Sequence, residues 1–310
     1  MRPWRNGLSN RYLSGGASLS WEHQYTKANS VQLHYVTQGS GKLIILLHGL
    51  FEFWYSWRHQ LPSLSRQFKV VVPDLRGYND SDKPRSGYDL DTLSADIQAL
   101  IRTLGYEKAH IVGHDWGGEI ALHLARRFPN SVDKLAVLST PQPKRWQTVL
   151  TYELSQRWEH LQRNWHLLAL QTPGLPQWLI KDNLPSLLPY LFQHQAVRKS
   201  AFTQANTELY QAALQKPGVI PAVLQHVRHC FSLNDWLSNW RSSSQLSAAR
   251  LKPPTLVLWG EEDNLVPAAG IIPPEFSDQT YIQHSIPDCG HWIQQEAPNS
   301  VNRELLQFFA

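Results

Sequence analysis

The chain of 310 residues lacks several features that would assign it to other classes of protein. It has only two cysteines, Cys230 and Cys289, which lie far apart and match no metal-ligand spacing. We interpret them as reduced thiols, which favours a cytoplasmic location, while a single disulfide between them stays open. No segment is long and apolar enough to span a membrane, and residues 1–21 lack the apolar stretch of a signal peptide.

The chain also lacks a large excess of positive or negative charge. The net charge is only +4, and the Lys and Arg residues are scattered, which gives little support for nucleic-acid binding. The hydrophobic content of 42% and the length instead suit one large α/β domain that carries an insertion. The sequence therefore predicts a globular protein without a nucleic-acid or membrane partner, and it leaves the oligomeric state open.

Apolar runs alternate with helical patterns in the order typical of a mostly parallel sheet. Helices are predicted for residues 90–104, 119–127 and 292–309. Strands are predicted for residues 31–37, 43–47, 70–73, 109–112, 135–139, 255–259 and 281–282.

The pattern changes in the middle of the chain, where Trp, Leu and Gln recur at helical spacing. We therefore predict an N-terminal extension (residues 1–22), an α/β core (23–140 and 251–310) and a helical cap (141–250). A helical cap over the carboxyl edge of such a sheet would cover a pocket where α/β sheets bind ligands.

The most informative motif is Gly-His-Asp-Trp-Gly-Gly at residues 113–118, between a predicted strand and a predicted helix. Gly-x-nucleophile-x-Gly describes a sharp strand-to-helix turn that exposes the central side chain, here Asp115. A nucleophilic Asp attacks a saturated carbon and makes an alkyl ester, whereas a Ser attacks a carbonyl. The alternative is that Asp115 is only the N-cap of the helix, but a cap requires neither the glycines nor the buried strand.

The remaining members of a triad follow in the order nucleophile, acid, histidine. Asp263 follows a predicted strand, and His291 opens the last helix. Because Asp115 is ionised at neutral pH, the task of His291 would be to activate water, with Asp263 orienting the ring. The neighbouring Glu261 and Glu262 compete with Asp263 for the acid role.

An oxyanion on the ester of Asp115 would need backbone donors. The N–H groups of Leu50, after the predicted strand 43–47, and of Trp116 are expected to supply them. The indole N–H of Trp116 is a further donor expected to reach the pocket.

Residues 48–58, 74–78, 113–118 and 290–292 together resemble the α/β-hydrolase-fold epoxide hydrolases, a family related to the haloalkane dehalogenases. The resemblance covers nearly the whole chain after the extension. It implies an α/β-hydrolase fold with a helical cap, a small hydrophobic epoxide or haloalkane and water as reactants, and no metal or organic cofactor.

The sequence departs from that family at three positions. Phe51 stands where the family usually has Pro. His166 and Trp240 stand where the family usually has the two cap tyrosines that hold and protonate the epoxide oxygen. A minor branch of the family pairs a cap histidine with a tyrosine, so the resemblance implies that His166 is an acid or hydrogen-bond donor. The alternative is a histidine that only packs in a Trp-rich helix.

The tyrosine that would pair with His166 cannot be placed from the sequence. Tyr210, Tyr152 and Tyr190 are the candidates.

The main alternative is a haloalkane dehalogenase, in which the indole of Trp116 and one from Trp165 or Trp240 would bind the halide. Leu50 argues against it, because dehalogenases often have Asn there. A fluoroacetate-type dehalogenase is less favoured, because it would require arginines at the positions of Trp116 and Glu119. A binding module that retains the pocket without turnover is the third alternative.

Overall fold

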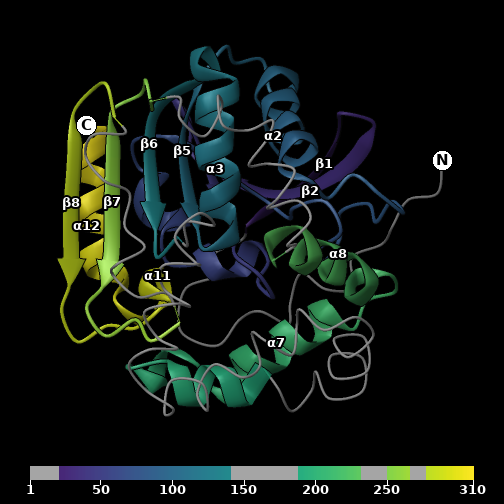
Figure 1. Ribbon diagram of the computed structural model, residues 1–310, viewed down its shortest axis with the longest axis vertical. Coiled ribbons are helices and arrows are strands. Elements are labelled where there is room, and N and C mark those ends of the chain that lie inside the picture. Colours follow the sequence, from purple (N-terminus) through teal and green to yellow (C-terminus); the bar gives the residue numbers. More distant parts are fainter. Residues whose placement is uncertain (1–20, 141–187, 232–249, 266–276) are drawn as a thin grey trace.

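A mixed sheet of eight strands forms the centre of the protein. The structure is a computed structural model that describes residues 21–140, 188–231, 250–265 and 277–310 (Figure 1). The strand order is β1-β2-β4-β3-β5-β6-β7-β8; β1 and β2 run antiparallel to their neighbours, and the remaining pairs are parallel. The strands are β1 (Glu22–Ala28), β2 (Val31–Gln38), β3 (Leu43–Leu47), β4 (Lys69–Pro73), β5 (Ala109–His114), β6 (Val132–Leu138), β7 (Thr255–Gly260) and β8 (Tyr281–Ile286).

The two strands that lead into the functional motifs lie in the middle of this sheet. Every residue of β3 and β5 is buried, as expected for parallel strands covered on both faces. The edge strand β8 has exposed residues at its centre. The loops that follow β3 and β5 therefore start from two fully buried strands at the centre of the sheet.

Helices cover both faces of the sheet. Helices α2 (Leu90–Thr103) and α3 (Trp116–Arg127) pack together on one face, and α1 (Leu61–Leu64) and α12 (Pro298–Phe309) on the other (Figure 1). The apolar sides of α2 and α3 are buried, which explains why their sequences have helical periodicity. Three short helices complete this part of the fold: η1 (Trp54–Trp57), η2 (Pro129–Ser131) and α11 (Ile293–Glu296).

Between β6 and β7 in sequence lie the described helices of the predicted cap. Residues 188–195 are helical, and η4 (Lys199–Ala201), α7 (Gln204–Leu214) and α8 (Val219–Phe231) follow them. Figure 1 shows α7 and α8 at the end of the sheet to which the arrows of β6, β7 and β8 point. The division into extension, core and cap at the predicted boundaries stays a prediction.

The prediction from sequence missed strand β1 and gave one helix where the structure has two. Strand β1 begins at Glu22, where we expected the extension to end. The predicted helix 292–309 is wrong as a single element, because Ala297, with φ −129° and ψ 54°, separates α11 from α12. The ring of Pro298 disfavours the helical conformation at the residue before it.

No helix among residues 21–140, 188–231, 250–265 and 277–310 is long and apolar enough to cross a membrane. Cys289 is a free, buried thiol, and burial raises its pKa to about 12. The side chain of Cys230 lies outside the described residues.

Candidate active site

Asp115 occupies the sharp turn between β5 and α3. Its backbone has φ 49° and ψ −120°, a conformation that non-glycine residues rarely adopt and that strained turns at functional sites often use. A Cβ on Gly113 would lie 2.3 Å from the carbonyl oxygen of Gly117, and one on Gly117 would lie 2.4 Å from that of Leu47. The glycines of the motif therefore permit a close approach of backbones that any larger residue would prevent.

The loop after β3 holds the carboxylate of Asp115 from one side. The backbone N–H of Leu50 donates to Oδ2 of Asp115 at 2.8 Å. The next residue, Phe51, has φ 60°, so this loop, like the turn at Asp115, contains a left-handed non-glycine residue. Trp116 starts α3 directly after Asp115, and its backbone N–H as a second donor stays a prediction.

His291 and Asp263 face Asp115 from the other side. Nδ1 of His291 lies 3.0 Å from Oδ2 of Asp263, and Nε2 lies 3.9 Å from Oδ1 of Asp115. Burial lowers the pKa of His291, but the charge and hydrogen bond of Asp263 and the charge of Asp115 outweigh it and raise the pKa to about 9. The structure thus brings the three predicted triad residues together, with a gap between His291 and Asp115.

Asp263, rather than a neighbouring glutamate, faces the histidine. The side chain of Asp263 is buried, and its second oxygen accepts the backbone N–H of Leu265 at 3.0 Å. Glu261 and Glu262 are exposed, and Glu261 accepts a hydrogen bond of 2.7 Å from the Ser285 hydroxyl. Only Asp263 of these three acids contacts His291 in the part of the chain that is described.

A second buried pair lies behind the triad, and sequence reasoning did not single it out. Nδ1 of His114 lies 2.8 Å from Oε2 of Glu52, and its Nε2 lies 3.0 Å from the carbonyl oxygen of His291. Both ring nitrogens of His114 thus face oxygen atoms, one of a carboxylate and one of the backbone. The signal was available, since both residues lie within the motifs that carry the resemblance.

Glu52 also links the loop after β3 to helix α11. Its Oε2 accepts the N–H of Gly49 at 2.8 Å, and its Oε1 accepts the amides of Gln294 and Gln295 at 3.1 and 2.9 Å. Burial would raise the pKa of Glu52, but the charge and hydrogen bond of His114 together with the N–H of Gly49 lower it below its ordinary value. An ionised Glu52 therefore ties the loop after β3 to the segment that carries His291.

The indole of Trp116 does not lie where we expected. Its N–H donates to Nδ1 of His226, on α8, at 2.9 Å, and both side chains are buried. The expectation that this indole N–H reaches the pocket is therefore wrong, because the N–H is hydrogen-bonded to a buried histidine.

The predicted cap residues are only partly covered by the structure. His166, Trp240, Tyr152 and Trp165 lie outside the described residues.

Tyr210 and Tyr190 are described, and their surroundings differ. The hydroxyl of Tyr210 donates to Oε1 of Gln295 at 2.9 Å, and burial holds its pKa well above the ordinary value. Tyr190 is 51% exposed and stacks on His194 with ring centroids 4.0 Å apart. The geometry argues against the ring-opening role predicted for Tyr210, because its proton is committed to Gln295.

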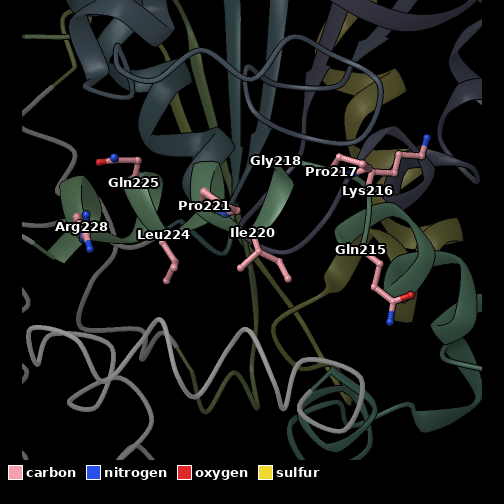
Figure 2. A pocket seen from close by; sticks show the side chains of 9 residues that line it. All are labelled: Gln215, Lys216, Pro217, Gly218, Ile220, Pro221, Leu224, Gln225 and Arg228. Carbon is pink, nitrogen blue, oxygen red and sulfur yellow. The ribbon is translucent and has the colours of Figure 1, made fainter.

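A hollow of about 440 Å³ lies at the turn between α7 and α8 (Figure 2). Its lining includes Ile220, Pro221 and Leu224, and Figure 2 shows Ile220 and Leu224 pointing to the same side of α8. None of its lining residues belongs to the triad.

Among the described residues, one group has three side chains that could together hold a metal ion: His34, Asp74 and Asp80. His34 already lies 2.6 Å from Asp74, and the exposed Asp80 pairs with Lys216 at 2.6 Å. A contact between His34 and Asp74 and an ion pair between Asp80 and Lys216 therefore account for the cluster.

The sheet order, the turn at Asp115 and the facing His–Asp pair are those of an α/β hydrolase. The family model of the alpha/beta hydrolase fold matches residues 42–298. The chain is 35% identical to "Epoxide hydrolase 4" of Mus musculus over 291 residues, which are 91% of this chain and 77% of that protein. It is 30% identical to "Epoxide hydrolase 1" of Caenorhabditis elegans over 295 residues, which are 93% of this chain and 70% of that protein.

Solved structures agree with these relatives. Cfl2 from Burkholderia cenocepacia superposes with a TM-score of 0.81 at 29% identity, covering 94% of this chain and 96% of that one. The epoxide hydrolase CorEH superposes with a TM-score of 0.77 at 26% identity, covering 93% and 98%. The chain belongs to the epoxide hydrolase family of α/β hydrolases, and it is a hydrolase enzyme.

Proposed function

We propose that this protein opens small hydrophobic epoxides to vicinal diols through an alkyl ester on Asp115. The observation that supports the proposal most directly is the placement of the Asp115 carboxylate between the N–H of Leu50 and the His291–Asp263 pair. A carboxylate held at a strained turn is a nucleophile suited to a saturated carbon.

In the first step, Oδ1 of Asp115 attacks the less hindered epoxide carbon, the C–O bond breaks, and the epoxide oxygen leaves as an alkoxide that must gain a proton. His166 supplies that proton together with a tyrosine partner. Tyr210 is disfavoured as this partner, because its hydroxyl donates to Gln295. Oδ2 is the oxygen that accepts from Leu50, so the attacking oxygen is the one on the side of His291.

In the second step, His291 removes a proton from water, and the water oxygen adds to the ester carbonyl. The N–H groups of Leu50 and Trp116 stabilise the oxyanion that develops on Asp115. Collapse of this intermediate breaks the ester C–O bond, and the imidazolium of His291 protonates the leaving alkoxide to give the diol. The acid formed on Asp115 loses its proton to solvent, which restores the carboxylate, and solvent reprotonates His166. The reaction requires no metal or organic cofactor.

Formation of the ester prepares the base for this step. The charge of Asp115 is one of the causes that raise the pKa of His291 to about 9. An ester is neutral, so the pKa of His291 falls once Asp115 is alkylated. The imidazole is therefore a proton acceptor at lower pH in the intermediate than in the free enzyme.

The test is the intact mass of a His291→Gln variant after exposure to a mixture of epoxides and haloalkanes. Loss of the water-activating base should trap the ester, and an epoxide adds its whole mass whereas a haloalkane adds only its alkyl group. The proposal expects an epoxide-sized adduct that is absent when Asp115→Asn is added. An alkyl-sized adduct alone would identify a dehalogenase, and no adduct would favour a binding protein.

A further inference from the structure

A buried chain of hydrogen bonds connects the residue after the nucleophile to the cap helix α8. The indole N–H of Trp116 donates to Nδ1 of His226 at 2.9 Å. Nε2 of His226 lies 2.8 Å from the backbone carbonyl oxygen of Arg76. Trp116 is 1% exposed and His226 is fully buried, so water does not compete for either bond.

The partners determine the tautomer of His226. An indole N–H is only a donor, so Nδ1 of His226 must accept, and a carbonyl oxygen is only an acceptor, so Nε2 must carry the proton. A neutral imidazole satisfies both partners, whereas a doubly protonated ring would oppose the indole N–H. Burial lowers the pKa of His226 to about 3, which keeps the ring neutral over the working pH range of most enzymes.

Aromatic rings hold the imidazole in this orientation. The centroids of Tyr78 and Tyr88 lie 4.9 and 5.0 Å from that of His226. The indole of Trp116 is therefore bound to a partner that is itself fixed on three sides, and it cannot turn its N–H toward Asp115 without breaking a buried hydrogen bond.

The consequence concerns the leaving group. A departing halide ion takes up no proton and is stabilised by N–H donors that point at it. The oxygen of an opened epoxide must instead be protonated. Trp116 is adjacent to Asp115 in sequence, so its indole N–H is a candidate donor for a halide released at Asp115.

We propose that His226 determines leaving-group specificity by binding the indole N–H of Trp116 and so withholding it from the pocket of Asp115. This inference rests on the proposed function, because it explains why the site would act on epoxides rather than on haloalkanes. His226 acts through Trp116 and is a positioning residue without contact to the reacting atoms.

The test observes the indole N–H itself in ¹H–¹⁵N spectra of the full chain. The Trp116 resonance is assigned by its loss in Trp116→Phe. Wild type, His226→Phe and His226→Gln are then titrated with sodium bromide at constant ionic strength. Gln is the matched control, because its amide can accept from the indole and donate to the carbonyl of Arg76.

The resonance is expected to stay in place in wild type and in His226→Gln. In His226→Phe it should move saturably, with bromide bound at least about tenfold more tightly than by wild type, the size expected for one hydrogen bond to an anion. Saturable movement in wild type, or none in a folded His226→Phe, would overturn the proposal. If His226→Phe does not fold, His226→Leu, which also lacks an acceptor for the indole N–H, is titrated in its place.

This measurement needs no turnover, so its failure is distinct from failure of the proposed function. An epoxide adduct in the trapping experiment together with a bromide response in wild type would overturn only the role of His226. The expected spectra without an epoxide adduct would overturn the proposed function. They would still show that His226 keeps the indole N–H of Trp116 away from bromide.

Discussion

Nε2 of His291 lies 3.9 Å from Oδ1 of Asp115, too far for a direct hydrogen bond and close enough for each charge to influence the other. A triad with a serine nucleophile needs direct contact, because the histidine must remove the serine proton. An aspartate needs no deprotonation at neutral pH. The separation is therefore consistent with a histidine that acts on water.

The charge on His291 predicts how stability depends on pH. Its folded pKa of about 9 lies above the ordinary value of 6.5, so its contribution is complete below pH 6.5 and is lost as the pH rises through 9. The contribution is on the order of 3 kcal/mol. Denaturant unfolding at pH 6 and pH 10 should give a larger loss of stability for wild type than for His291→Gln. Equal losses would contradict the raised pKa.

The nucleophile predicts the effect of Asp115→Asn. An amide oxygen is a poor nucleophile, so turnover of an epoxide should fall at least about a thousandfold, with little change in the free energy of unfolding. Diol formation in steady state measures the first, and urea unfolding measures the second. Retention of more than a tenth of wild-type turnover would exclude Asp115 as the nucleophile.

The choice of acid predicts a difference between two neighbouring carboxylates. Asp263→Asn removes the charge that raises the pKa of His291, and ester hydrolysis should slow about 10²- to 10⁴-fold while ester formation continues. Rapid-quench mass spectrometry should show the ester accumulating. Glu261→Gln is the matched control; its side chain is exposed and bonds Ser285, so hydrolysis should stay within about twofold of wild type, as for surface changes away from a site.

The pair behind the triad predicts a cost in stability. Glu52→Gln removes the buried charge that faces His114, which should destabilise the protein by about 3–5 kcal/mol. Asp91→Asn, in an exposed pair with Arg127, should cost less than about 1 kcal/mol. Thermal unfolding of both variants checks the comparison, and equal shifts in Tm would mean that the buried pair contributes no more than a surface pair.

The acid proposed for ring opening, His166, predicts a pH effect. If His166 donates the proton, His166→Phe should slow ester formation about 10²- to 10⁴-fold in the His291→Gln background. His166→Tyr should retain ester formation and extend it to higher pH, because a phenol has a pKa near 10 and an imidazole near 6.5. Stopped-flow measurement of ester formation against pH tests both variants. Unchanged rates in His166→Phe would assign the acid to another residue.

The sequence alone predicted the sharp turn at Asp115 and most of the strands of the core. Residues 109–127 carry a buried strand, a glycine turn and an amphipathic helix, and each of these depends on local periodicity or on a local conformational need. For the same reason the parallel sheet was predictable from alternating apolar and helical segments. The break in the helix at Ala297 also has a local cause, the following Pro298, which our prediction overlooked.

Only the tertiary structure decided contacts between segments far apart in the chain. It distinguished Asp263 from Glu261 and Glu262 by burial and by distance to His291, which no local pattern encodes. It also directed the hydroxyl of Tyr210 to Gln295 and the indole of Trp116 to His226, 110 residues away in sequence. The direction of a single N–H or O–H depends on which acceptor the packing brings within 3 Å, and that is a property of the folded chain.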